Sequence, residues 1–395
     1  MNIFIRSIIL KELIKMSEWK IPLYKVYTDD EDVNLITKII KRGTYWAMGP
    51  EIEEFENNIK DYVGCDYCLT LNSGTSALHA LLLANGISDN DEVIIPSFSF
   101  IATANSTLFV NATPVFADIE KITFGLDPES IQKNISPNTR VIMPVDFAGL
   151  SCKIFEIKEI AEKNNLILIE DAAECLGSTV NGKKVGSISD SAIFSFCGNK
   201  VLTTGEGGAI VTNSEEIYEK IKTIRSHGRL DKKLYFDDPS KPNYLQLGFN
   251  WRMSSITAAL GITQLSKLDK IISKRRENAK YISTHLMKHE KIKVPSEPSG
   301  YTHIYQMYSI VLSNKKLRDD LQKHLLNDKI FCKVYFDPIH LTDFYKERLK
   351  KIISLPITEN ISERILTLPM YPNMTQEEKE YLVNSIDTFF ETRNN

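Results

Sequence analysis

The stretch that decides the fold and the chemistry is Phe194-Ser195-Phe196-Cys197-Gly198-Asn199-Lys200-Val201-Leu202-Thr203-Thr204-Gly205-Glu206-Gly207-Gly208. It places Lys200 between an apolar run, typical of a strand, and a turn with three glycines. Glycines permit tight turns close to a bound group, and desolvation favours the neutral amine, which is the nucleophilic form. A solvated loop lysine is the alternative, but it leaves the apolar approach and the nearby hydroxyl of Ser195 unexplained.

A second candidate site residue, Asp171, follows an apolar run at residues 166–170 that predicts a buried strand. In open α/β sheets, ligands bind at the carboxyl ends of the strands. A carboxylate at this edge can pair with a protonated ring nitrogen and keep it charged. The alternative is that Asp171 caps the segment that follows it, and the motif alone leaves both roles open.

The third candidate is Asn72-Ser73-Gly74-Thr75-Ser76, which lies between a predicted strand and a predicted apolar helix. The free amides and the dipole at the start of a helix attract anions such as phosphate. Gly74 would let a phosphate approach the backbone, and Thr75 and Ser76 add hydroxyl groups. Serine at a helix start is also a common capping residue, so the motif alone permits either role.

Apolar runs alternate with helical periodicity along most of the chain, which is the pattern of a buried parallel sheet. The expected strands are residues 69–71, 92–96, 113–118, 141–145 and 166–170, with a hairpin-like pair at 192–196 and 208–212. The expected helices include residues 29–42, 51–62, 77–84 and 101–110, and a long helix at 253–276 that bridges two domains. We therefore expect an α/β fold: a large domain at residues 21–265 with a mostly parallel sheet, and a smaller α+β C-terminal domain at residues 266–395.

Composition and charge give no sign of a nucleic-acid or membrane partner. The 395 residues carry a formal net charge of −3, and 43% hydrophobic and 25% charged residues are ordinary for a soluble globular protein. Residues 1–20 are expected to form an N-terminal extension, either a disordered arm or the product of a wrongly assigned start, with a surface-binding amphipathic helix as the less favoured alternative. The first fifteen are too short and too charged to cross a bilayer, and they lack a cleavage site.

Six cysteines are scattered along the chain, and two of them, Cys65 and Cys68, have redox or zinc spacing. A zinc site would need a second such pair or a histidine cluster, and the sequence has neither. We therefore expect structural thiols, no metal, and a cytoplasmic protein.

Taken together, these motifs resemble the DegT/DnrJ/EryC1/StrS family of sugar aminotransferases, which depend on pyridoxal 5'-phosphate (PLP). Matching blocks run in family order from about Pro22 to Pro369, and several ordered blocks are far more specific than any single motif. They are Gly49-Pro50-Glu51-Ile52-Glu53-Glu54-Phe55-Glu56, Ser73-Gly74-Thr75-Ser76-Ala77-Leu78, Pro96-Ser97-Phe98-Ser99-Phe100, Glu170-Asp171-Ala172-Ala173-Glu174, Gly205-Glu206-Gly207-Gly208, Ser226-His227-Gly228-Arg229, Gly248-Phe249-Asn250-Trp251-Arg252-Met253 and Leu368-Pro369. The resemblance implies PLP fold type I, the fold of aspartate aminotransferase.

The resemblance also implies the two catalytic residues. Lys200 would form the Schiff base with PLP and then act as the general base and acid that moves a proton during transfer. Asp171 would pair with the pyridinium nitrogen, which the cofactor needs as an electron sink. A branch of the family with dehydratase activity has His in place of the lysine, so Lys200 argues against that branch.

Other residues are implied to hold the cofactor. They are Gly74, Thr75 and Ser195 at the phosphate, Phe100 stacked on the ring, Glu174 near the phenolic oxygen, where the family often has Gln, and Asn250, which reaches the phosphate from the neighbouring subunit. The last of these implies a homodimer with shared active sites. Arg252 belongs either to the same site or to an ion pair at the interface.

The family resemblance implies transfer of an amino group from an amino acid, most simply L-glutamate, to a keto sugar linked to a nucleotide. Cys197-Gly198-Asn199-Lys200 is similar to perosamine-synthase-like members, which aminate C4 of a 4-keto-6-deoxy sugar. The family often has His at the positions of Cys197 and Asp146, and these departures concern the substrate. We expect the acceptor pocket to involve residues 44–48 and 335–340.

Several alternatives stay open at this point. The acceptor could be a 3-keto sugar or a keto-cyclitol. The chain could also be a PLP-binding regulator without turnover, or a PLP enzyme with other chemistry, such as a lyase.

Overall fold

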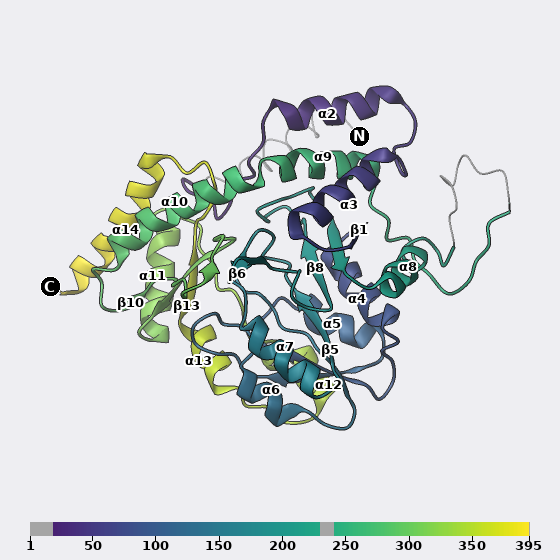
Figure 1. Cartoon of the computed structure of the whole chain (residues 1–395). Helices are drawn as coiled ribbons and strands as arrows, with labels where there is room; N and C mark the ends of the chain where they lie inside the picture. Colours follow the sequence, from purple (N-terminus) through teal and green to yellow (C-terminus); the bar gives the residue numbers. More distant parts are fainter. Residues whose placement is uncertain (1–18, 230–240, 395) are drawn as a thin grey trace, which may run out of the picture.

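The computed structural model describes residues 19–229 and 241–394. The N-terminal extension predicted at residues 1–20 therefore lies outside the described residues, except for Trp19 and Lys20. Figure 1 shows a large sheet with helices around it, and a group of C-terminal helices and strands beside it on the left. None of the described helices combines the length and the apolar character needed to cross a membrane.

The large sheet has seven strands, and all but one of them run in parallel. In spatial order they are β1 (Tyr67–Leu71), β9 (Gly208–Thr212), β8 (Ser191–Ser195), β5 (Ile167–Asp171), β4 (Thr139–Ile142), β2 (Glu92–Pro96) and β3 (Thr113–Ala117). The exception is β9, which runs antiparallel to β1 and β8. The parallel sheet and the predicted pairing of residues 192–196 with 208–212 are thus confirmed.

Both faces of this sheet are buried, because its apolar side chains alternate between two cores. In β8, for example, Ile193 packs into one core while Ala192 and Phe194 pack into the other. The strands of such a sheet therefore appear in the sequence as continuous apolar runs rather than as an alternation of apolar and polar residues. The helices of the large unit are α3 (Pro50–Val63), α4 (Gly74–Ala84), α5 (Ala102–Phe109), α6 (Pro128–Asn134), α7 (Ile154–Lys163) and α8 (Glu215–Ile224).

The C-terminal part contains a small antiparallel sheet with helices packed on it (Figure 1). Its strands are β10 (Ile292–Lys293), β12 (Tyr308–Leu312) and β13 (Ile365–Leu368), and the helices around it are α11 (Lys315–Asn327), α13 (Pro356–Arg364) and α14 (Gln376–Asn394). Two short elements of the same part of the chain, η2 (Ile339–Leu341) and α12 (Asp343–Leu349), pack against the large sheet instead. A third sheet joins β6 (Thr179–Val180) and β7 (Lys183–Lys184) of the large unit to β11 (Tyr301–Thr302).

The chain crosses between the two units more than once. Ile21 is buried in the C-terminal core, and its N–H donates to the carbonyl of Lys329 at 3.2 Å. Conversely, Ile339 and Tyr345 are buried in a core of the large sheet. The division of the chain at residue 265 stays a prediction.

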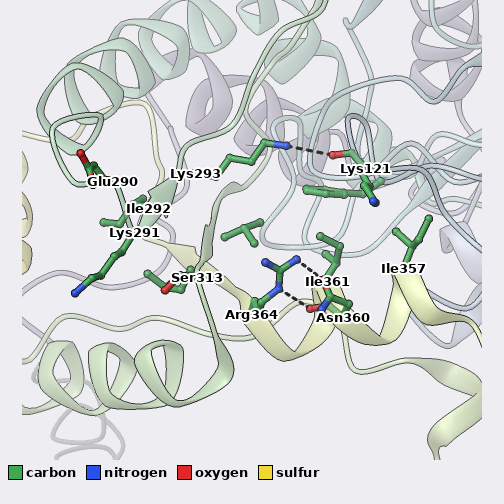
Figure 2. A pocket seen from close by; sticks show the side chains of 13 residues that line it. Lys121, Glu290, Lys291, Ile292, Lys293, Ser313, Ile357, Asn360, Ile361 and Arg364 are labelled. Atoms are coloured by element: carbon green, nitrogen blue, oxygen red, sulfur yellow. Dashed lines mark hydrogen bonds between the residues drawn. The ribbon is translucent and has the colours of Figure 1, made fainter.

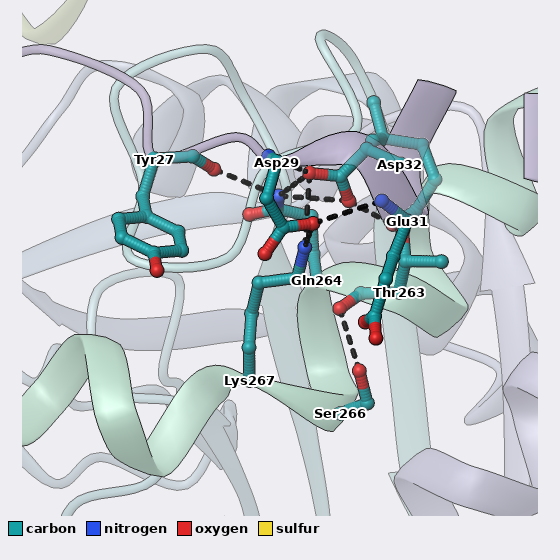
Figure 3. A network of polar contacts seen from close by, with 9 residues as sticks. Tyr27, Asp29, Glu31, Asp32, Thr263, Gln264, Ser266 and Lys267 are labelled. Atoms are coloured by element: carbon teal, nitrogen blue, oxygen red, sulfur yellow. Dashed lines mark hydrogen bonds and ion pairs between the residues drawn. The ribbon is translucent and has the colours of Figure 1, made fainter. Parts of the chain in front are cut away.

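The single long helix predicted at residues 253–276 is wrong, because the structure has two helices there: α9 (Ser255–Ser266) and α10 (Leu268–Leu286). Between them Lys267 leaves helical geometry, with φ −109° and ψ 7°. Its ammonium lies between the carboxylates of Asp29 and Asp32, at 3.0 Å from the latter (Figure 3). Because Asp29 caps α2 (Asp30–Arg42), these ion pairs fasten the first helix to the junction of α9 and α10.

The register of the sheet gathers the predicted site at one edge. Leu71, Gly208 and Ser195 occupy one row across β1, β9 and β8, and Asp171 pairs with Ile193 on the next strand. The start of α4 and the loop that carries Lys200 both follow directly from this edge. This is the edge at which α/β sheets bind ligands.

Candidate functional site

Lys200 lies in a loop that folds back on itself just beyond β8. Its N–H donates to the carbonyl of Cys197 at 3.0 Å, and the N–H of Thr204 donates to Phe196 at 2.9 Å. The side chain is only 13% exposed, and Nζ lies 3.2 Å from Oε1 of Glu174. The interpretation of Lys200 as a held lysine, rather than a solvated one, is therefore consistent with its surroundings.

Glu174 makes contacts with both of its carboxylate oxygens. Oε1 faces Lys200, and Oε2 accepts the N–H of Ala148 at 2.8 Å. Ala148 itself has a positive φ of 59°, so the backbone turns sharply there. The carboxylate thus links the loop after β4 to the lysine.

Asp171 is buried at the end of β5, with 4% of its surface exposed. Oδ2 accepts the hydroxyl of Thr103 at 2.8 Å, and Oδ1 accepts the N–H of Ala173 at 3.3 Å. Burial raises the pKa of Asp171, while the hydrogen bond from Thr103 and the positive charge of Lys200 oppose this shift. A buried carboxylate of this kind is suited to a cationic partner such as a protonated ring nitrogen.

Thr103 was not expected from the sequence. It lies three residues beyond Phe100, on α5, and only the fold brings its hydroxyl to Asp171. No spacing within the sequence signals this contact, because 68 residues separate the two partners.

The start of α4 provides a cradle for an anion. Ser73 is the capping residue, since its Oγ accepts the N–H of Ser76 at 3.1 Å, and the hydroxyl of Ser76 donates to Oδ1 of Asn72 at 2.6 Å. A Cβ at Gly74 would lie 3.1 Å from Cβ of Ser195, so a side chain there would crowd the space between α4 and β8. The amides of the first helical turn have no partner within the helix, and those of Gly74 and Thr75 are free to meet a phosphate.

Two further predicted residues border this region. Phe100 is 62% exposed, although its carbonyl accepts the N–H of Thr103 at the start of α5. Asn250 is exposed, and its carbonyl accepts the side-chain amide of Asn72 at 3.4 Å. Asn250 therefore lies beside the start of α4 of its own chain, and its predicted reach into a neighbouring subunit stays a prediction.

The segments expected to form the acceptor pocket are only partly near the lysine. Tyr335 lines a hollow of about 20 Å³ together with Asn199 and Gln306. His340 instead is buried, and its ring lies 2.7 Å from the hydroxyl of Ser97 and 3.3 Å from Glu359. The predicted loop at residues 44–48 contacts the start of α9, where the N–H of Ser255 donates to the carbonyl of Trp46.

A separate cavity of about 220 Å³ lies between β10, β12 and α13 (Figure 2). Basic side chains border it, among them Lys121, Lys291, Lys293 and Arg364. Arg364 donates to Asn360 within α13, and Lys293 donates to the carbonyl of Lys121 at 3.4 Å. None of the predicted site residues lines this cavity, so it is distinct from the sheet edge described above.

Metal chemistry has no candidate ligand set in the described part of the chain, where no group of three or more His, Cys, Asp or Glu residues could hold an ion. The sheet edge instead offers an amine at Lys200, a buried carboxylate at Asp171 and an anion cradle at Gly74. These are the partners that an aldehyde, a ring nitrogen and a phosphate require, so the residues fit PLP.

Comparison with known proteins identifies the family of the chain. The profile of the DegT/DnrJ/EryC1/StrS aminotransferase family matches residues 26–387. The GDP-perosamine synthase of Escherichia coli O157:H7 is 34% identical over 370 residues, which cover 94% of this chain and 98% of the relative.

Solved structures show the same fold. PseC of Helicobacter pylori, an aminotransferase involved in the biosynthesis of pseudoaminic acid, has a TM-score of 0.88 and 29% identity, covering 94% of this chain and 99% of its own. The PLP form of Spr1654 of Streptococcus pneumoniae has a TM-score of 0.88 at 24% identity, covering 94% of this chain and 99% of its own. The chain belongs to the DegT/DnrJ/EryC1/StrS aminotransferase family and is a PLP-dependent sugar aminotransferase.

Proposed function

We propose that this enzyme transfers the amino group of L-glutamate to C4 of a 4-keto-6-deoxy sugar linked to a nucleoside diphosphate. The observation that carries the transfer chemistry is the position of Nζ of Lys200, 3.2 Å from Glu174 at the sheet edge where Asp171 ends β5. The choice of acceptor is supported by the segment Cys197-Gly198-Asn199-Lys200 and by the relative named as a GDP-perosamine synthase.

In this proposal the chain's own residues divide the work of proton transfer. When bound, PLP supplies the electron sink that stabilises the carbon from which a proton is removed. Nζ of Lys200 takes that proton from the donor carbon and later returns a proton to the carbon of the acceptor. The carboxylate of Glu174 orients Nζ, and Asp171 holds a proton on the ring nitrogen, with Thr103 fixing its carboxylate.

The remaining predicted residues position the cofactor. We propose that the amides of Gly74 and Thr75 and the hydroxyl of Ser195 bind the phosphate, because they border the cradle at the start of α4. The exposed ring of Phe100 would cover the flat face of the pyridine ring. Asn250 would complete the phosphate site across a subunit boundary.

Three further proposals concern the assembly, the cellular location and the domains of the enzyme. The enzyme works as a homodimer in which each subunit contributes to its partner's site. It works in the cytoplasm, where thiols stay reduced, and all six cysteines are unpaired. Its large PLP-binding domain spans residues 21–265 and its small domain residues 266–395.

The test is transfer of isotope-labelled nitrogen. Purified enzyme with PLP is incubated with L-glutamate carrying labelled nitrogen and with a panel of nucleotide-linked sugars that bear the ketone at C4 or at C3. The expected result is release of 2-oxoglutarate together with a labelled amino group at C4. Labelled nitrogen at C3 would overturn the choice of C4. Transfer to a free keto-cyclitol that is tested in parallel, with none to the nucleotide-linked sugars, would overturn the class of acceptor. Consumption of the sugar without an amino donor would indicate other PLP chemistry.

A further inference from the structure

The backbone on both sides of Lys200 is held by one side chain from the C-terminal unit. Gln306 is buried, with 4% of its surface exposed. Its Oε1 accepts the N–H of Val201 at 2.7 Å, and its Nε2 donates to the carbonyl of Asn199 at 2.8 Å. The side-chain amide of Gln306 thus binds the backbone of both residues that flank Lys200. Its NH₂ group donates to Asn199, and its oxygen accepts from Val201.

These two hydrogen bonds from Gln306, called the clamp below, hold a loop that has no regular secondary structure. The lysine loop lies beyond the end of β8 and before β9, so it has no strand partner of its own. Its backbone hydrogen bonds include those from Lys200 to Cys197 and from Thr204 to Phe196, but they form no regular ladder. Since a backbone without regular hydrogen bonds opens readily, the position of the Lys200 Cα depends on contacts supplied from outside the loop.

Gln306 is itself fixed on both sides. The buried guanidinium of Arg275, on α10, donates to the carbonyls of Tyr305 and Gln306 at 3.0 and 3.3 Å. On the other side Gly149 lies so close that a Cβ there would approach the Gln306 nitrogen to 2.7 Å. The backbone from which the glutamine side chain projects is therefore held on both sides.

The same segment also reaches the partner of the lysine side chain. The N–H of Met307 donates to the carbonyl of Ala148 at 3.1 Å, and the N–H of Ala148 donates to Glu174 at 2.8 Å. Glu174 in turn contacts Nζ of Lys200. The segment at residues 305–307 thus fixes the position of the Lys200 backbone. Through Ala148 it also fixes the position of the Glu174 carboxylate that faces the lysine amine.

We propose that Gln306 is a positioning residue for Lys200, which couples the C-terminal unit to the reactive amine of the large sheet. It acts through the peptide groups at Asn199 and Val201 and does not touch the reacting atoms. The inference rests on the proposed role of Lys200. Misplacing a catalytic group by about 1 Å can cost about a hundredfold in rate, so the clamp matters for turnover rather than for substrate affinity.

The test compares Gln306→Leu with Asn278→Leu. Asn278 is a matched control because it is equally buried and its amide donates to two backbone carbonyls, those of Tyr371 and Pro372, away from the lysine loop. Hydrogen exchange of residues 197–204 is measured in cofactor-free protein, and kcat and KM for glutamate are measured with PLP.

For Gln306→Leu we expect amide exchange in the loop to rise by about tenfold or more and kcat to fall by about ten- to a hundredfold. KM for glutamate should change by less than about threefold, since ground-state binding is untouched. Asn278→Leu should lower stability but leave loop exchange and kcat near wild type.

Gln306→Met gives a second readout if the leucine variant does not fold. It keeps the length of the side chain and loses both hydrogen bonds, so exchange at the Val201 amide should rise and kcat should fall. Unchanged loop exchange in Gln306→Leu, or an equal rise in Asn278→Leu, would overturn the proposal. Because exchange is read without cofactor, this result is separate from any failure of the proposed transfer reaction.

Discussion

Nζ of Lys200 lies 3.2 Å from Oε1 of Glu174, while Oε2 of the same carboxylate accepts the N–H of Ala148. Glu174 therefore does two things at once: it orients the amine and it satisfies a backbone donor in the loop after β4. The sequence-based expectation placed Glu174 near the phenolic oxygen of the cofactor, where the family often has Gln. That role stays a prediction, and the contact between Oε1 and Nζ of Lys200 is the one that the structure shows.

Two substitutions of Glu174 should show whether activity depends on the negative charge of its side chain or on the hydrogen bonds that the side chain makes. Glu174→Gln keeps an oxygen for one contact and the same length, so kcat/KM should stay within about tenfold of wild type. Glu174→Leu leaves the amine and the Ala148 N–H without a partner, and kcat/KM should fall by about a hundredfold. Steady-state rates with thermal midpoints as a folding control check this, and equal losses in both variants would contradict it.

Asp171→Asn should retain the fold but lose most of the activity. The amide can still accept from Thr103, but it cannot hold a proton on a ring nitrogen by charge pairing. We expect kcat to fall by about a hundred- to a thousandfold, as for other electrostatic contributions to a transition state. Thr103→Val is the matched control, because it removes the hydroxyl that contacts Asp171 and Ser99 but leaves the charge of Asp171 in place. If the valine variant loses as much activity as the asparagine variant, the charge of Asp171 is not the cause.

Asp146 and Glu170 form a buried pair of carboxyl groups behind the site. Oδ1 of Asp146 accepts the N–H of Cys152, and Oε2 of Glu170 accepts the N–H of Gly186 and the hydroxyl of Ser189. Oδ2 of Asp146 and Oε1 of Glu170 have no other partner among the described residues. Burial, and then the charge of Glu170, raise the pKa of Asp146 well above its usual range, so the pair holds a proton.

Asp146→Asn should therefore stabilise the protein at alkaline pH. A carboxyl whose pKa is raised on folding binds an extra proton in the native state, so this contribution to stability is lost as pH rises through the native pKa. The asparagine amide can donate to Glu170 without that proton. We expect the difference in unfolding free energy between the variant and wild type, measured in urea, to shift in favour of the variant as the pH rises. A difference that does not change with pH would contradict the shared proton.

His303 should make the protein sensitive to acid. It is buried, its Nδ1 accepts the N–H of Tyr305 at 2.9 Å, and its ring stacks on Tyr305 at 4.0 Å. Burial lowers the pKa of His303 to about 3. Because the unfolded chain takes up this proton from about pH 6.5 downward, stability should fall with decreasing pH below that value, by up to about 1.4 kcal/mol per pH unit.

The test is the slope of unfolding free energy against pH. His303→Asn keeps an acceptor for Tyr305 and has no proton to take up, so its slope between about pH 6.5 and 5 should be shallower than that of wild type. Identical slopes for wild type and His303→Asn would show that other groups cause the acid sensitivity.

Much of the large sheet could be predicted because its physical cause is local. Strands buried on both faces must be apolar throughout, and this makes runs such as residues 92–96 visible in the sequence. The positions of Lys200, Asp171 and Gly74 at one sheet edge follow from the same rule, since Asp171 ends β5 and the other two lie in the segments that follow β8 and β1.

The contacts that complete the site could not be predicted in this way. Gln306 reaches Asn199 across 107 residues, and Thr103 reaches Asp171 across 68. Neither residue belongs to a local sequence motif. Thr103 reaches the site only through the packing of α5, and Gln306 only through the packing of the segment before β12. The break at Lys267 was missed for the same reason: its cause is a pair of carboxylates more than two hundred residues away.

The most direct test of the central claim is an absorbance spectrum of the purified protein with saturating PLP, before and after L-glutamate is added. Wild type, Lys200→Ala and the control Lys184→Ala, a half-buried lysine on β7, are compared. We expect a visible band in wild type and in the control that glutamate bleaches, and no such band in Lys200→Ala. A wild-type protein that binds no PLP, or a Lys200→Ala variant that keeps a band bleached by glutamate, would contradict the assignment of Lys200.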